Sequence, residues 1–164
     1  MPRVAVCALL LLPTAACDSP ATLDEAARIL AKDGNELATF HYLENKRVTD
    51  ETGKDGDDPI ACPEGTARRS YRFIGDLGTS KAISAKKQVD LAGLPFGYAL
   101  LGLGYELDHS TSSVQSGRRV GVWRKKKPGL TVTLVMRSSV PNVEIIGKTD
   151  CLVPTHEASS PSVP

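Results

Sequence analysis

The side chains with the most reactive chemistry in this sequence are four cysteines, Cys7, Cys17, Cys62 and Cys151. A thiolate can bind a metal, exchange disulfides or form a stable disulfide, and the spacing of the cysteines separates these roles. No Cys-x-x-Cys motif is present to suggest a redox enzyme, and no close pairs suggest a zinc site. The spacing therefore favours a structural role for Cys62 and Cys151.

The N-terminal segment has the pattern of a secretory signal. Arg3 supplies a positive charge, residues 4–12 form an unbroken apolar run, and residues 13–16 bring small side chains before Cys17. The apolar run is about half as long as a membrane-spanning helix must be. We therefore expect residues 1–16 to be a signal peptide that is removed on export.

Residues 14–17 (Thr-Ala-Ala-Cys) resemble the lipobox of bacterial lipoproteins, in which the cysteine is diacylated and becomes the new N-terminus. The third residue before the cysteine is threonine here, whereas the lipobox usually has leucine. The alternative is ordinary cleavage before Cys17, which would release a soluble secreted protein. Lipidation leaves an even number of thiols, because the signal takes Cys7 with it and Cys62 and Cys151 form one pair. The sequence therefore favours a lipid anchor on the extracytoplasmic face of the cell membrane.

A disulfide between Cys62 and Cys151 is expected in such an oxidising compartment. It would close a loop of about 90 residues, which chain-entropy arguments value at about 4.5 kcal/mol. The bond would join the start of the folded core to its end.

The charge of the exported chain is balanced overall but uneven along its length. The signal contains one of the 20 basic residues, Arg3, so the exported chain has 19 basic and 19 acidic residues. A chain with no net charge is not expected to bind nucleic acid. Between His109 and Val143 there is no acid. A basic hairpin of this kind is typical of a solvated turn that also protects an edge strand, and the alternative prediction is contact with an anionic lipid, wall polymer or envelope protein. The residues of this cluster are Arg118, Arg119, Arg124, Lys125, Lys126 and Lys127.

The first element after the signal is a helix over about residues 22–33. Thr22 and Glu25 have the spacing of a capping box, and apolar residues recur at helical spacing from Leu23 to Leu30. Gly34 stands where a helix-ending glycine is expected.

The chain beyond Cys62 is typical of strands interrupted by one helix. Residues 130–136 alternate apolar and polar with period two, and the turn at Lys127-Pro128-Gly129 predicts a hairpin with residues 120–124. A short buried helix is predicted from Pro95 to Leu103, because proline is favoured in a first turn. Further strands are expected over residues 66–74, 104–107 and 143–146, with Gly147 ending the last, whereas residues 36–45 fit either helix or strand.

These elements predict one α+β domain over residues 22–154. An antiparallel β-sheet would pack against the N-terminal helix and the internal helix, with one disulfide. Residues 17–21 would be the lipidated cysteine and its tether, and residues 155–164 are rich in Pro and Ser and predicted to be disordered.

The order of motifs is similar to that of small actinobacterial lipoproteins of unknown function, the LppA-like group of mycobacteria. The resemblance spans residues 17–153 and implies an α+β fold, a disulfide and an anchor on the outer face of the membrane. It carries no catalytic residues to this chain. The motifs are Cys17, Cys62-Pro63-Glu64-Gly65, Arg68 to Tyr71, Gly104-Tyr105, Thr131 to Thr133, Pro141-Asn142-Val143 and Gly147 to Cys151.

The sequence offers few residues for catalysis or cofactor binding. His41, His109 and His156 lack partners at metal-ligand spacing, and the acidic loop at residues 50–58 lacks the register of an EF-hand. No Gly-x-Ser-x-Gly elbow is present. We therefore expect no metal, no cofactor and no catalytic residue.

Two functional hypotheses remain. The first is a non-catalytic binding or scaffolding module held on the membrane surface. The second is a cell-envelope enzyme whose site forms only in the fold, and a pocket lined by Arg68, Tyr71 or His109 would favour it.

Overall fold

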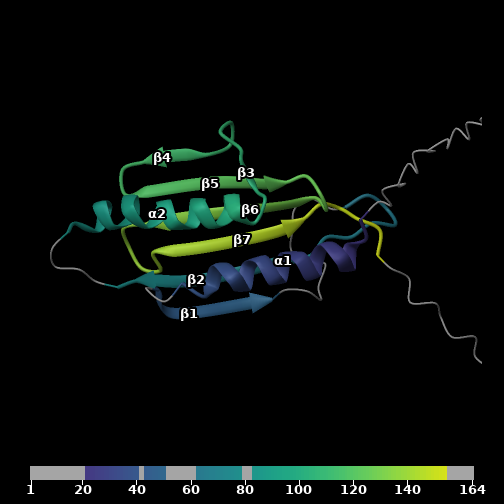
Figure 1. Cartoon of the computed structure of the whole chain (residues 1–164), viewed down its shortest axis with the longest axis horizontal. Helices are drawn as coiled ribbons and strands as arrows, with labels where there is room; N and C mark the ends of the chain where they lie inside the picture. The colour runs from purple at the N-terminus through teal and green to yellow at the C-terminus, as the bar shows by residue number, and fades with distance from the viewer. Residues whose placement is uncertain (1–20, 41–42, 51–61, 79–82, 155–164) are drawn as a thin grey trace, which may run out of the picture.

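The computed structural model describes residues 21–40, 43–50, 62–78 and 83–154 (Figure 1). The predicted signal peptide, Cys17 and the predicted disordered tail lie outside these residues, as does most of the acidic loop.

Among the described residues, two helices and seven strands form two layers, which confirms the α+β class. Every strand pair is antiparallel, and the order across the sheet is β1-β2-β7-β6-β5-β3, with β4 also paired to β5. Both helices lie over the same side of the sheet (Figure 1). The helices are α1 (Leu23–Ala38) and α2 (Ala85–Gly102), and the strands are β1 (Leu43–Asp50), β2 (Ser70–Leu77), β3 (Glu106–Leu107), β4 (Ser113–Gln115), β5 (Arg118–Lys125), β6 (Leu130–Arg137) and β7 (Val143–Thr149).

The core lies between the sheet and the two helices. The predicted alternation of β6 is confirmed, because Leu130, Val132, Leu134 and Met136 are buried on the helical side. Helix α1 packs on β2 and β7, and α2 packs on β5 and β6. The predicted hairpin is also present, with β5 and β6 in register from Arg118 to Lys125.

Helix α1 begins as the sequence predicts and ends later. The Thr22 side chain accepts a hydrogen bond from the backbone N–H of Glu25 at 3.3 Å. The helix then continues through Gly34 to Ala38, so the predicted end at residue 33 is wrong. Gly34 is buried, and a Cβ atom there would overlap the ring of Tyr71. This glycine allows close packing rather than ending the helix.

Strand β7 also contains a glycine, Gly147, at a close contact with α1. It continues through Gly147 to Thr149, so the predicted end of the strand at Gly147 is wrong. A Cβ atom on Gly147 would lie 2.5 Å from Cδ1 of Leu30 on α1, and Gly147 is also the cross-strand partner of Tyr71. The two glycines together let α1 approach the sheet closely.

The other element boundaries differ from the sequence predictions for tertiary reasons. Helix α2 begins after Ser84, whose side chain accepts a hydrogen bond from the N–H of Lys87, and Pro95 lies inside the helix. Burial of Val89 and Phe96 in the core offsets the cost of an internal proline. The ambiguous stretch at residues 36–45 divides between the end of α1 and the start of β1.

The predicted disulfide between Cys62 and Cys151 is present. Their Cα atoms are 5.5 Å apart, within the usual range for a disulfide, and the sequence separation is 89 residues. The bond joins the segment before β2 to the segment after β7. Nearby, the backbone N–H of Leu23 donates to the carbonyl of Val153 at 3.1 Å, which fixes the start of α1 to the same end of the domain.

Replacing Gly34 by alanine should destabilise the fold by about 1 to 3 kcal/mol, because overpacking against Tyr71 outweighs the gain in helix propensity. Equilibrium denaturation in guanidinium chloride measures this free energy of unfolding. Gly102→Ala is the matched control, since nothing lies within 4 Å of a Cβ atom added at that position. If both variants unfold at the same denaturant concentration as the wild type, the close approach at Gly34 does not limit packing.

Candidate functional site

The predicted basic cluster lies on β5 and in the turn that follows it. Because side chains alternate along a strand, Arg119 and Lys125 point to the helical side of the sheet, where their partners on β6 are core residues. Arg118 and Arg124 point to the opposite side, and Arg118 lies directly across from Arg137. The four bases of the strand therefore divide between two surfaces of the domain.

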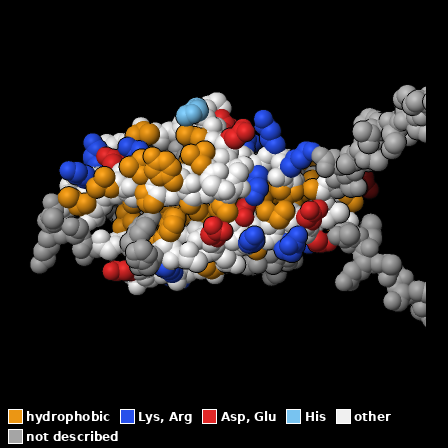
Figure 2. Space-filling view, in the orientation of Figure 1, with side chains coloured by type: hydrophobic (Ala, Val, Ile, Leu, Met, Phe, Trp, Pro, Cys, Tyr) orange, Lys and Arg blue, Asp and Glu red, His pale blue; other side chains and the backbone are white. Residues whose placement is uncertain are grey.

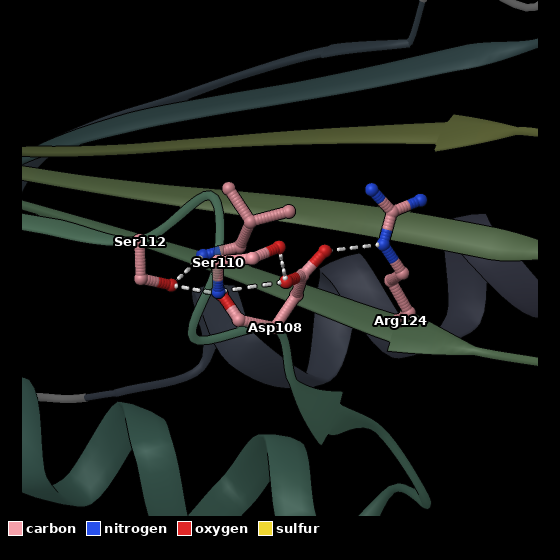
Figure 3. Close-up of polar contacts among 5 residues, drawn as sticks. Asp108, Ser110, Ser112 and Arg124 are labelled. Atoms are coloured by element: carbon pink, nitrogen blue, oxygen red, sulfur yellow. Dashed lines mark hydrogen bonds and ion pairs between the residues drawn. The ribbon is translucent and has the colours of Figure 1, made fainter.

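Arg124 belongs to a polar cluster that holds the loop after β3 against β5 (Figure 3). Its Nε donates to Oδ2 of Asp108 at 2.8 Å, and the hydroxyl of Ser110 donates to Oδ1 of Asp108 at 2.6 Å. The hydroxyl of Ser112 donates to the Asp108 carbonyl at 2.7 Å. The hydrogen bonds from Ser110 and then Arg124 hold the pKa of Asp108 well below its usual range. The arrangement fixes a loop and keeps this carboxylate ionised.

Arg119 and Lys126 of the cluster also have acidic partners. Arg119 Nε lies 2.8 Å from Oδ1 of Asp90 on α2, and Lys126 Nζ lies 3.8 Å from a carboxylate oxygen of Glu106 on β3. These acids precede residue 109 in the sequence, so the charge pattern along the chain does not reveal them. The fold neutralises much of the basic run locally.

Lys125 belongs to a largely buried polar cluster close to Gly104, which follows α2. Its Nζ donates to Oδ2 of Asp33 at 3.0 Å, and the hydroxyl of Tyr105 donates to the same oxygen at 3.0 Å. Asp33 is 4% exposed. Burial, together with the charge of Asp33 and its hydrogen bond, raises the pKa of Tyr105 far above its usual value. Tyr105 therefore stays protonated and serves as a hydrogen-bond donor that links α1 to the sheet.

Glu144 forms the corresponding cluster on the side of the sheet opposite the helices. Nε and Nη2 of Arg72 donate to Oε1 of Glu144 at 3.1 and 2.7 Å, and Arg137 Nη2 donates to Oε2 at 2.5 Å. Glu144 is only 6% exposed, and burial alone would raise its pKa. The hydrogen bonds and charges of Arg137 and Arg72 outweigh burial and lower that pKa. This cluster joins β2, β7 and β6.

The residues that would favour the enzyme hypothesis lie apart from one another. Tyr71 is buried in the core, with its hydroxyl 3.3 Å from Oδ1 of Asn35. Arg68 donates to the sulfur of Cys151, and His109 is exposed in the loop after β3. Within the described part of the chain, no group of three His, Cys, Asp or Glu side chains could hold a metal ion.

The outer face of α2 is an unusual surface that the sequence did not indicate. Leu91, Leu94, Tyr98 and Leu101 are 49%, 58%, 72% and 55% exposed. An open apolar hollow of about 370 Å³ lies beside them, lined in part by Leu77, Ile83 and Pro95. No described helix is both long enough and apolar enough to cross a membrane. We refer to Leu91, Leu94, Tyr98 and Leu101 as the α2 stripe.

Replacing Glu144 by glutamine should destabilise the fold by about 1 to 3 kcal/mol at pH 7, because charge-assisted hydrogen bonds to two arginines are weakened. The folded-state pKa of Glu144 is lowered, so its stabilisation is complete above the unfolded value of about 4.3 and is lost as the pH falls through the folded value. The difference in melting temperature between wild type and variant should therefore shrink on acidification from pH 7 to about pH 3.

Glu106→Gln is the control, since the side chain of Glu106 is 77% exposed and exposed ion pairs contribute little. A gap between wild type and Glu144→Gln that stays constant with pH would show that the charge of Glu144 is not the source of its stabilisation.

Comparison with known proteins assigns no family to the chain. No family model matches it, and searches of curated proteins and of solved structures also find no match. Its function must therefore be inferred from its own residues and contacts.

Proposed function

We propose that this chain is an exported lipoprotein whose domain acts as a non-catalytic binding or scaffolding module on the outer face of the cell membrane. Residues 1–16 direct export, and Cys17 carries the lipid. The observation that carries the proposal is the pairing of Cys62 with Cys151, which occupies the two cysteines that lie within the folded domain. Cys17 then remains as the single thiol of the exported chain, directly after a run of small residues.

The disulfide supports the proposed location because such bonds persist in oxidising compartments and are rare in the cytosol. The resemblance to small actinobacterial lipoproteins supports the same proposal, since its motifs include the segments around Cys62 and Cys151. A soluble secreted protein with the same disulfide is the alternative, and the state of Cys17 separates the two.

The contacts of the buried polar groups favour a binding module over an enzyme. A general acid or base must exchange a proton with its substrate, and its pKa is usually tuned toward the working pH. The carboxylate of Glu144 has a lowered pKa and two arginine partners, and the pKa of Tyr105 is raised far above neutrality. Both groups therefore keep one protonation state near pH 7, which suits structural roles.

The short tether keeps the domain close to the lipid. Five residues, 18–22, separate Cys17 from α1, and an extended chain from Cys17 to Leu23 spans at most about 20 Å. Partners of the domain are therefore components of the membrane surface: anionic lipid, wall polymer or envelope protein. Contact of such partners with the basic residues of β5 stays a prediction, and it concerns mainly the exposed side of the strand that carries Arg118 and Arg124.

Replacing Cys17 by alanine in cells that export the protein should move it from the membrane fraction to the medium, because the acylated thiol is lost. Fractionation and immunoblotting measure the distribution. Ser19→Ala, a change in the same tether, is the control and should leave the protein in the membrane fraction.

Alkylation of the denatured, unreduced protein provides a second readout and should add nothing at Cys62 or Cys151. Retention of the Cys17→Ala protein in membranes without lipid on any residue would contradict the anchor, and a label on Cys62 or Cys151 would contradict the disulfide.

A further inference from the structure

The two helices of the domain present opposite kinds of surface to their surroundings. Both pack on the same side of the sheet, yet charged side chains are exposed along α1, whereas hydrophobic side chains gather over α2 (Figures 1 and 2). The exposed charged residues of α1 are Asp24, Glu25, Arg28, Lys32 and Glu36. Helix α1 therefore has the polar outer face of an ordinary surface helix, and α2 does not.

The α2 stripe is a continuous ridge along its helix. Its members are spaced by three, four and three residues, which places them on one face of the helix. All four are about half exposed or more, and the adjoining hollow is lined mainly by apolar side chains. Exposed apolar surface of this extent, in contrast to scattered single residues, marks an interaction site.

The charges around the α2 stripe fit an anionic surface. Lys86 and Lys87 are exposed in the first turn of α2. The single acid of the helix, Asp90, is paired with Arg119 at 2.8 Å. Outward apolar residues with lysines at one end of the helix suit contact with a membrane interface, where each well-placed lysine adds about 1 kcal/mol near anionic lipid.

The position of the tether also favours a lipid surface. Helix α1 begins at Leu23, six positions after Cys17 in the sequence, and lies in the helical layer to which α2 also belongs (Figure 1). A lipid on Cys17 would therefore hold the domain near the membrane by its helical layer. A second copy of the chain is a weaker fit, because four side chains on one helix are far fewer than the roughly 20 to 30 residues a side of a stable protein interface.

We propose that the α2 stripe inserts into the headgroup region of an anionic membrane and orients the domain with its helices toward the lipid. The proposal depends on the proposed function for the location of the domain, but it does not require the lipid on Cys17. The sheet face opposite the helices, which carries Glu144 and its arginines, then points away from the membrane and is available to partners.

The test uses the chain from Asp18 to Pro164, which lacks Cys17 and retains every residue that the structure describes. It is mixed with vesicles of phosphatidylcholine and phosphatidylglycerol, and binding is measured by flotation. Leu94→Glu/Tyr98→Glu should weaken binding roughly tenfold or more, because two apolar side chains no longer enter the interface. Val114→Glu/Val140→Glu is the matched control, since it adds the same charge at two residues that are 71% and 70% exposed elsewhere.

Salt separates this mode of binding from contact through the basic residues of β5. Binding by inserted apolar side chains should persist at an ionic strength that screens exposed charges, whereas binding through arginines and lysines alone should not.

An environment-sensitive fluorophore gives a readout that does not depend on these glutamate variants. Attached at Leu94→Cys, it should shift to the blue when vesicles are added, and at Gln115→Cys, an exposed position that pairs with Arg118 on the side of the sheet opposite the helices, it should not.

Three results would overturn the proposal. The wild-type chain could fail to bind the vesicles, the two double variants could bind the vesicles equally well, or the two fluorophores could show the same spectral shift. Analytical ultracentrifugation tests whether a second copy of the chain binds the α2 stripe instead of lipid. A dimer that Leu94→Glu/Tyr98→Glu converts to a monomer would assign the α2 stripe to self-association. Because the anchor is tested separately with Cys17→Ala, failure here leaves the proposed lipidation standing.

Discussion

The close contact of α1 with β2 and β7 is the constraint on which the rest of this structure depends. Gly34 and Gly147 have no side chain, so the Tyr71 ring packs directly against the backbone at Gly34 and Leu30 packs directly against the backbone at Gly147. The contact places Asp33 deep enough to accept hydrogen bonds from Tyr105 and Lys125, which ties α1 to the far half of the sheet. It also brings the start of α1 beside the segment that carries the disulfide. The entry of the tether into the domain is thereby fixed.

Several charged side chains on and beside the sheet pair with one another, and these pairs limit which surfaces are available to partners. Asp33 is buried with a basic partner on the helical side of the sheet, and Glu144 is buried with basic partners on the opposite side. Asp90 and Asp108 pair with basic residues of β5. The α2 stripe is a surface whose exposure the internal contacts do not explain. The proposed membrane-anchored module would account for that exposure, because lipid would cover the outer face of α2.

Local patterns in the sequence predicted the elements whose signals are themselves local. The alternation from Leu130 to Met136, the capping residue Thr22 and the two cysteines of the disulfide all correspond to features of the structure. The sequence predicts an ending at Gly34 and at Gly147, because a sequence does not show that a side chain from elsewhere packs against a glycine.

The remaining differences arise from partners distant in sequence. The N-cap at Ser84 and burial of Val89 extend α2 well ahead of Pro95. The basic run of β5 resembled one patch because its acidic partners come from other elements, and strand alternation sends neighbouring bases to opposite sides of the sheet. The exposure of the α2 stripe depends on which side of α2 meets the core, and the apolar run from Leu91 to Leu101 does not specify that side.

The most direct test of the account is intact-mass spectrometry of the protein extracted from membranes of cells that export it. The predicted mass is that of a chain beginning at Cys17 with a diacylglyceryl group attached, and reduction should add only the two hydrogens of one disulfide. A chain that begins at Cys17 with no added lipid would contradict the anchor, and with it the proposal that a lipid holds this domain at the membrane.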